Sequence, residues 1–167
     1  AANFAADADI LRTFDPKWKL NPPVRSKRHV NFCIEALRDD TLDIIASGHA
    51  PRAAEKKMMV IDEAPYGMLG LETALGLVGV KLVEPGLLDW PAVVQKMSAN
   101  PAKLLSLADR GTLRVGAAAD ITIIDPNERW TVDPNRFRSK SQNSPLVGWE
   151  LLARATDVFV AGKHFEC

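Results

Sequence analysis

The first part of the chain combines a proline-rich opening with apolar positions at helical spacing. Pro22 and Pro23 stand side by side, which excludes a helix interior or a central strand and predicts an extended loop over residues 21–25. The apolar residues after this loop fall on one helical face, and they are Val30, Cys33, Ile34 and Leu37. Ser26 suits the position before a helix, because its hydroxyl can accept a hydrogen bond from a free backbone N–H. We therefore expect a helix that begins after Ser26 and ends at Asp39-Asp40.

A short apolar run and three further helical patterns follow. Residues 41–46 predict a strand that is buried on at least one face, and residues 47–52 form the loop at its carboxyl end. Apolar positions recur at helical spacing from Met68 to about Val83, where Glu84-Pro85-Gly86 ends the helix. Pro91 suits the first turn of another helix, and Asn100-Pro101 suits the start of a short one that ends near Leu107.

The pattern changes at Gly111, after which short β-rich runs are separated by Gly, Pro, Asp and Asn. These runs are residues 112–115, 121–124, 130–132 and 158–160. Ala161-Gly162 is typical of a hairpin turn between the last run and residues 163–165. The sequence therefore predicts an α/β protein, with strands and helices in the first two-thirds and a small β unit in the last third.

Composition and charge exclude several classes of protein. The 167 residues are 47% hydrophobic and 25% charged, and 21 Lys plus Arg balance 21 Asp plus Glu. A net charge of zero argues against a broad electrostatic surface for nucleic acid or membrane. Lys81 and Glu84 interrupt the most apolar stretch before it reaches the ~20 residues of a membrane span. Cys33 and Cys167 make no disulfide framework, which fits a cytoplasmic location. Because the chain starts at Ala1 without an initiator Met, we expect a piece of a longer protein.

Few residues carry obvious chemistry on their own. His49 follows the expected strand at its carboxyl end, where barrels and open α/β folds build their sites. A single histidine without another ligand at suitable spacing is only a weak metal candidate. Asn21 could offer an amide to a ligand or cap a turn, and Arg52 could bind a carboxylate or be a surface charge. The pair Lys56-Lys57 is expected to be a solvated face.

Several motifs in order resemble the long-type dihydroorotases. Residues 12–25 are similar to the substrate loop of that family, residues 47–52 to its Thr-Asp-His-Ala-Pro-His motif, and residues 62–67 to its Glu-Ala-Pro-Phe-Gly loop. Further segments match in the same order, and they are residues 70–75, 100–102, 111–116, 120–126 and 137–141. The resemblance covers essentially the whole chain.

This resemblance implies the C-terminal half of an amidohydrolase-superfamily protein. Residues 1–108 would then be the C-terminal portion of a (β/α)8 TIM barrel, and residues 109–167 part of a small β-sandwich domain. The reaction of the family belongs to de novo pyrimidine (UMP) biosynthesis and closes N-carbamoyl-L-aspartate reversibly to dihydroorotate. Zinc polarises the amide carbonyl and activates water in that family, while an aspartate moves the proton.

The family's site residues are only partly retained here. Asn21 stands at the position of a substrate-binding Asn, and the Tyr66-Gly67 backbone at that of the substrate loop. Gly48, however, stands at the position of the catalytic, metal-binding Asp, and Arg52 replaces a substrate-binding His. Glycine can neither bind zinc nor carry a proton.

Ala2 or its neighbour falls where the family has a metal-binding His. We therefore expect this chain alone to bind no zinc and to have no dihydroorotase activity, with His49 a weak metal candidate.

Three functions stay open at this point. The chain could belong to a dihydroorotase-like protein whose catalysis is impaired or silent, with dihydroorotate or N-carbamoyl-aspartate as its ligand. It could instead be a non-catalytic scaffold, for which the resemblance suggests aspartate carbamoyltransferase as a partner. A relative of allantoinase or hydantoinase is the third alternative. In each case we expect a homo-oligomer that binds neither nucleic acid nor membrane.

Overall fold

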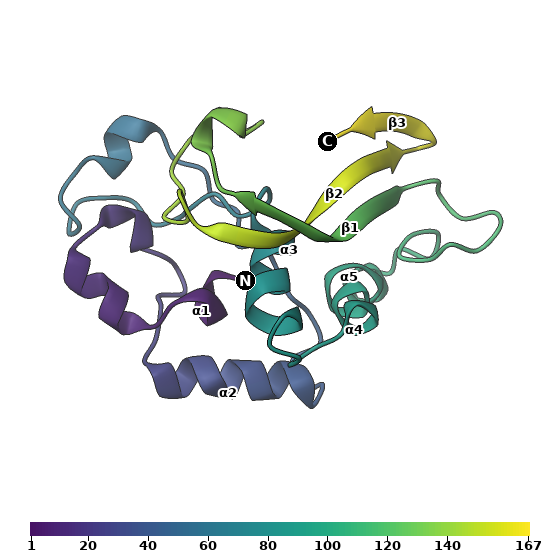
Figure 1. Ribbon diagram of the computed structural model, residues 1–167, viewed down its shortest axis with the longest axis horizontal. Coiled ribbons are helices and arrows are strands. Elements are labelled where there is room, and N and C mark those ends of the chain that lie inside the picture. Colours follow the sequence, from purple (N-terminus) through teal and green to yellow (C-terminus); the bar gives the residue numbers. More distant parts are fainter.

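A computed structural model describes residues 1–167 as a set of helices packed against one twisted sheet (Figure 1). The α-helices are α1 (Ala2–Ala5), α2 (Lys27–Arg38), α3 (Ala74–Val78), α4 (Trp90–Val94) and α5 (Asn100–Leu104). The π-helical turns η4 (Gly79–Val83) and η5 (Gln95–Ala99) extend α3 and join α4 to α5. The 3-10 turns are η1 (Ala8–Thr13), η2 (Pro16–Trp18), η3 (Ala54–Lys57) and η6 (Pro134–Arg136). None of these helices combines the length and the apolar composition that a membrane-spanning segment requires.

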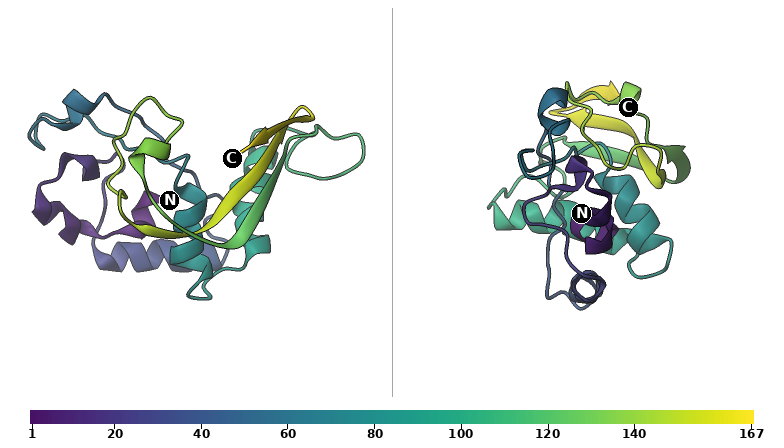
Figure 2. Two further views of the ribbon diagram at one scale, coloured as in Figure 1. Left: turned by 45° about the horizontal axis from the view of Figure 1, so that its top comes forward. Right: turned by 90° about the vertical axis from the view of Figure 1, so that its left-hand side faces the viewer.

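The sheet contains β1 (Ile121–Thr131), β2 (Glu150–Val160) and β3 (Lys163–Glu166) in the order β1-β2-β3, with both pairs antiparallel. The register of β1 against β2 shifts between Asp125 and Arg129. Pro126 falls within this irregularity, where its missing N–H interrupts no regular ladder. The two predicted runs 121–124 and 130–132 therefore lie in and around one long strand, which curves across the molecule (Figure 2).

The predicted hairpin turn at Ala161-Gly162 is confirmed. Val160 pairs with Lys163, and both turn residues have positive φ angles, 50° and 78°. Two such residues match the right-handed twist of the flanking strands. The predicted strand 112–115 is wrong, because this segment pairs with no other strand and leaves Leu113 and Val115 exposed.

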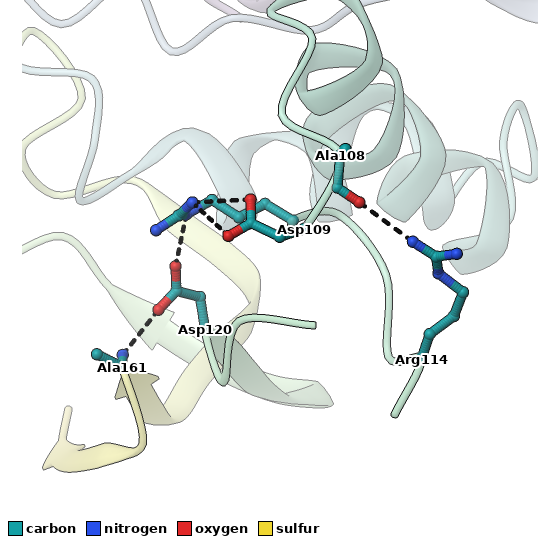
Figure 3. A network of polar contacts seen from close by, with 6 residues as sticks. Ala108, Asp109, Arg114, Asp120 and Ala161 are labelled. Atoms are coloured by element: carbon teal, nitrogen blue, oxygen red, sulfur yellow. Dashed lines mark hydrogen bonds and ion pairs between the residues drawn. The ribbon is translucent and has the colours of Figure 1, made fainter. Parts of the chain in front are cut away.

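Charged side chains connect the loop before β1 to the β2–β3 turn (Figure 3). Asp120 accepts hydrogen bonds from Nε of Arg110 at 2.9 Å and from the N–H of Ala161 at 2.7 Å. Arg110 also bonds the carboxylate of Asp109. The Ala161 N–H, followed by Arg110, holds the pKa of Asp120 below its usual value. These exposed contacts fix the loop against the end of the sheet.

The hydrophobic core lies where α3 and η4 pack between α2 and the sheet. Leu77, Val78 and Leu82 are almost fully buried at its centre. Gly79 allows the helix backbone to approach β2, since a Cβ there would lie 2.0 Å from the carbonyl oxygen of Leu152. The core also draws on α2, α4 and the segment around β2, through Val30, Leu37, Val93, Leu146 and Leu151.

The helix predicted after Ser26 is confirmed by α2, but the Ser26 hydroxyl bonds Nδ1 of His29 at 2.7 Å and does not cap the backbone as expected. The predicted strand 41–46 is wrong. Side chains of the helical run from Trp90 to Leu104 bond the backbone carbonyls of residues 41–46. Lys96 donates to the Leu42 carbonyl at 2.9 Å, and Asn100 donates to the Asp43 carbonyl at 2.8 Å. A strand needs a neighbouring strand to complete its ladder, and residues 41–46 have none.

Two predicted helix starts are also corrected. The helix expected from Met68 begins at Ala74, because residues 68–70 are extended and pair with another loop. Asn100 does not start a helix but continues the helical run that begins at Trp90. The Asn100 side chain does not cap a helix but donates to the Asp43 carbonyl, and so joins this helical run to the segment 41–46.

Candidate functional site

The loops of residues 47–52 and 62–68 lie side by side at the candidate site. His49 and Met68 form an isolated parallel bridge, and the Ala50 N–H donates to the Met68 carbonyl at 2.8 Å. Gly67 lies close to this contact, since a Cβ on it would meet the Ala50 carbonyl oxygen at 2.6 Å. The two motifs that carry the resemblance are therefore in direct backbone contact.

His49 is held by the backbone that follows the second loop. Its Nδ1 accepts hydrogen bonds from the N–H groups of Gly70 and Leu71, both at 3.3 Å. Because Nδ1 accepts, the ring proton lies on Nε2. Nδ1 is thus occupied by backbone donors, and these contacts explain His49 as a residue that holds the two loops together.

Gly48 offers no functional group at the position where the resemblance implies an aspartate. Its φ is +69°, and a Cβ built on it would have no atom within 4 Å. The space for a side chain exists, and Asp is among the few residues that tolerate this backbone region. The position therefore retains the room for a carboxylate but not the carboxylate.

Asn143 is the polar centre of the site, and its side chain is 3% exposed. Its Oδ1 accepts the Arg52 N–H at 3.1 Å, and its Nδ2 donates to the Gly67 carbonyl at 3.3 Å. The Ser141 hydroxyl bonds both Asn143 Oδ1 and the Arg52 carbonyl. One amide from the segment before β2 thus joins the two loops that the sequence singled out.

Positive charge gathers around the Tyr66–Gly67 backbone. Arg52 Nε donates to the Tyr66 carbonyl at 2.7 Å, and Lys19 Nζ lies 5.1 Å from the centre of the Tyr66 ring. The Lys19 carbonyl accepts the Gly67 N–H at 3.0 Å and also faces Lys57 Nζ at 3.4 Å.

Lys57 is 5% exposed, and its Nζ donates to the Pro16 carbonyl at 2.8 Å. Burial, followed by repulsion from Arg52, lowers the pKa of Lys57 to about 8. The predicted solvated face is therefore wrong for Lys57 and holds for its exposed neighbour Lys56.

Only some of the predicted site residues contact the hydrogen bonds around Asn143. Tyr66, Gly67 and Arg52 are in mutual contact through Asn143. Asn21 is exposed and its side chain makes no hydrogen bond, although Lys19 of the same loop does reach Gly67. Ala2 is buried in the apolar core, where it offers no ligand.

The side chains of this chain do not fit a zinc centre. No three His, Cys, Asp or Glu side chains come together anywhere in residues 1–167. A catalytic zinc site keeps about three protein ligands, and here Nδ1 of His49 accepts two backbone hydrogen bonds and Gly48 has no side chain. The side chains of residues 1–167 therefore do not by themselves form a catalytic zinc site.

Sequence reasoning missed several residues that shape the site. Asn143 and Ser141 lie at or just past the end of the matched segment 137–141, so their place beside the matched loops was an available signal. The Glu72 carboxylate accepts hydrogen bonds from the N–H groups of Arg138 and Ser139, at 2.6 and 3.1 Å. It thereby attaches that segment to the residues just before α3. The burial of Lys57 had no signal, because a lysine pair on a polar stretch is usually solvated.

Comparison with known proteins defines the class of this molecule. A protein-family model described as "Amidohydrolase family" matches residues 63–163. The chain belongs to the amidohydrolase family.

Among curated proteins, the chain is similar to the dihydroorotase of Geobacter metallireducens, with 47% identity over 160 residues. That match covers 96% of this chain and 37% of the relative. A putative dihydroorotase of Rhodopirellula baltica is 40% identical over 161 residues, which are 96% of this chain and 35% of that protein. The chain thus spans little more than a third of these relatives.

Among solved structures, an L-hydantoinase (dihydropyrimidinase) from Arthrobacter aurescens superposes with a TM-score of 0.90 at 31% sequence identity. The match covers 97% of this chain and 37% of that protein. A D-hydantoinase from Thermus sp. gives a TM-score of 0.85 at 27% identity, over 96% and 37% of the two chains. The mixed helices and antiparallel sheet of this chain therefore match about a third of the hydantoinase fold.

Proposed function

We propose that this chain is the carboxyl-terminal section of a dihydroorotase-like amidohydrolase in which cyclic-amide chemistry is silent. The sequence identity of 40–47% to dihydroorotases supports dihydroorotate and N-carbamoyl-L-aspartate as the ligands of the site. We infer from the hydantoinase superposition that residues 1–108 are the end of a (β/α)8 barrel and residues 109–167 part of a β-sandwich.

The observation that carries the silent function is Gly48, in a loop that also has Arg52 where the family has a histidine. Opening or closing a cyclic amide requires a group that activates water and a group that moves a proton. The loop keeps its backbone contacts to Met68 and Gly67, yet position 48 has no atom beyond Cα. Nδ1 of His49 is occupied by two backbone donors, so this atom does not supply the missing group.

The ligand-binding part of the site supports retained binding. Arg52 can present its remaining N–H groups to a carboxylate, a geometry that guanidinium matches in pairs. The Tyr66-Gly67 backbone and Asn21 are the other groups that we assign to ligand contact. Dihydroorotate and N-carbamoyl-L-aspartate both carry carboxylates and amides that suit these partners.

The test measures binding and turnover of the natural protein, isolated intact and supplied with zinc. We expect dihydroorotate to bind in calorimetry, and we expect the absorbance of dihydroorotate to stay constant over hours of incubation. A steady conversion to N-carbamoyl-L-aspartate above that of buffer with zinc would overturn the proposal. If neither dihydroorotate nor N-carbamoyl-L-aspartate binds, the ligand assignment is wrong, while the proposed lack of catalysis still stands.

A hydantoinase-like function is the second candidate, favoured by the TM-score of 0.90 to an L-hydantoinase. It requires the same proton transfer, so Gly48 argues against activity here as well. Hydantoin and dihydrouracil in the same assay separate the two candidates by which ring compound binds.

A scaffold function is supported by exposed apolar side chains at the end of α5 and in the loop that follows. These side chains are Leu104, Leu105, Leu113 and Val115. We propose that they contact another copy or a partner such as aspartate carbamoyltransferase. Light scattering of the natural protein, alone and mixed with that enzyme, tests this: a monomer in both cases would rule out assembly.

A further inference from the structure

A cavity of about 440 Å³ lies between the residues that lead into α3, the sheet and the loop around η6. This volume falls in the range of small-molecule sites, which is about 300–1,000 Å³. None of the residues around Gly48 and Asn143 that form the candidate site lines it. The apolar part of its lining includes Leu71, Leu75, Trp130, Phe137 and Phe165.

The apolar lining is rich in aromatic side chains and is partly open to solvent. Trp130, Phe137 and Phe165 come from β1, the loop after η6 and β3, and they line the same cavity. Leu71 is 65% exposed and Phe165 is 46% exposed, although both line a concave surface. Aromatic rings pack well against one another in offset or edge-to-face arrangements. The lining therefore favours a ligand with flat aromatic rings.

Most of the carboxylates in the lining are already bound to backbone donors. Both Glu72 oxygens accept N–H groups from residues 138–139, at 2.6 and 3.1 Å. Oδ1 of Asp133 accepts the Asn135 N–H at 2.9 Å. The third carboxylate, on Glu166, belongs to an exposed residue at the end of β3.

The arginines of the lining differ in their partners. Arg154 pairs with Glu128 at 3.2 Å and lies over the Trp130 ring. Arg136 and Arg138 also line the cavity, but neither takes part in an ion pair of the chain. An acidic group on a ligand would give these two guanidinium groups the partner that they lack.

We propose that this cavity binds a small aromatic acid, a compound of one or two flat rings that carries one acidic group. The rings pack against the aromatic lining, and the acidic group pairs with Arg136 and Arg138 at the loop after η6. This site is separate from the cyclic-amide site and does not depend on the proposed function.

The cavity shares its wall with the backbone that holds His49. The Leu71 N–H donates to Nδ1 of His49 at 3.3 Å, while Leu71 itself lines the cavity. A ligand in the cavity therefore contacts a residue that bonds the His49 ring. The ring signals of His49 should report its binding without any need for catalysis.

The experiment is calorimetry on the intact natural protein with 2-naphthoate as the probe. We expect binding at about 1 mM or below, and we expect the uncharged 2-naphthylmethanol to bind about fivefold more weakly. In NMR spectra, saturation with 2-naphthoate should shift the ring signals of His49 and leave those of His29 on α2 unchanged.

Variants with matched controls locate the probe. Leu71→Trp fills the cavity and should weaken 2-naphthoate binding about tenfold or more, while Val60→Trp, an equally exposed position outside the lining, should stay within about twofold. The Arg136→Gln/Arg138→Gln variant should lose about fivefold for 2-naphthoate but not for 2-naphthylmethanol. Lys140→Gln, on the same segment outside the lining, is its control.

Four results would overturn the proposal. They are no binding of 2-naphthoate up to about 2 mM, equal affinity of the acid and the alcohol, equal affinity in the Leu71→Trp and Val60→Trp variants, and binding that leaves the His49 signals in place. Because none of these measurements uses turnover of dihydroorotate, this proposal and the proposed function fail separately.

Discussion

Replacing Asn143 with alanine should destabilise the site more than any exposed substitution near it. The change leaves two backbone groups without their partners: the N–H of Arg52, 3.1 Å from Oδ1, and the carbonyl of Gly67, 3.3 Å from Nδ2. A buried polar group without a partner costs about 1–3 kcal/mol. For two such groups we therefore expect the free energy of unfolding to fall by about 2–6 kcal/mol, which lowers Tm by about 4–24 °C for a protein of this size.

Urea denaturation of the natural protein and its variants measures this loss. Gln142→Ala is the matched control, because Gln142 is the adjacent residue and its exposed side chain makes one long bond of 3.4 Å to the Pro134 carbonyl. It should change the free energy of unfolding by no more than about 0.5 kcal/mol. Asn143→Asp keeps the acceptor for Arg52 but cannot donate to Gly67, so its loss should be intermediate. If Asn143→Ala costs no more than Gln142→Ala, Asn143 does not join the two loops energetically.

Three further changes test other parts of the account. Gly67→Ala should destabilise by several kcal/mol, since its φ is +123° and its Cβ would lie 2.6 Å from the Ala50 carbonyl oxygen; Gly86→Ala, with φ +71° and open space, should lose only about 1 kcal/mol in the same urea titration. Folding lowers the pKa of Lys57 from 10.5 to about 8, so the unfolded chain binds the proton more tightly. The free energy of unfolding should therefore rise with pH between about 8 and 10.5. Thermal melts of the natural protein that show no such rise relative to Lys57→Met would contradict the low pKa. Gly48→Asp should fold with a loss of about 1 kcal/mol, since its side chain meets open space at a left-handed φ, and a loss of several kcal/mol in urea would show that the carboxylate no longer fits.

Elements that depend on their own sequence were predictable, and those that depend on neighbours were not. The helix α2 begins after Ser26 because a stripe of apolar residues at helical spacing is a local property. The hairpin turn at Ala161-Gly162 follows equally from two adjacent residues that tolerate positive φ. Residues 41–46 have the composition of a strand, but a strand forms only against another strand, and Lys96 and Asn100 bind their carbonyls instead.

The same distinction holds for the site. The two motifs at residues 47–52 and 62–67 and the glycine at position 48 could be read from the sequence, but the contact between the loops and the open space at Gly48 appear only in the structure. The role of Asn143 depends on a segment about 75 to 90 residues away reaching both loops. The buried Lys57 ammonium bonds the carbonyls of Pro16 and Lys19, about 40 residues earlier in the chain, which no local pattern around Lys57 indicates.

The most direct test of the silent site compares ring opening of dihydroorotate by the natural protein and by its Gly48→Asp/Arg52→His double variant, both supplied with zinc. The account predicts no turnover above buffer for the natural protein. It predicts measurable turnover for the double variant, whose carboxylate enters the open space at position 48, in a full-length chain whose upstream section supplies the family's His-x-His zinc ligands. A natural protein that turns over dihydroorotate as fast as the double variant would contradict the account, because position 48 would then have no part in the chemistry.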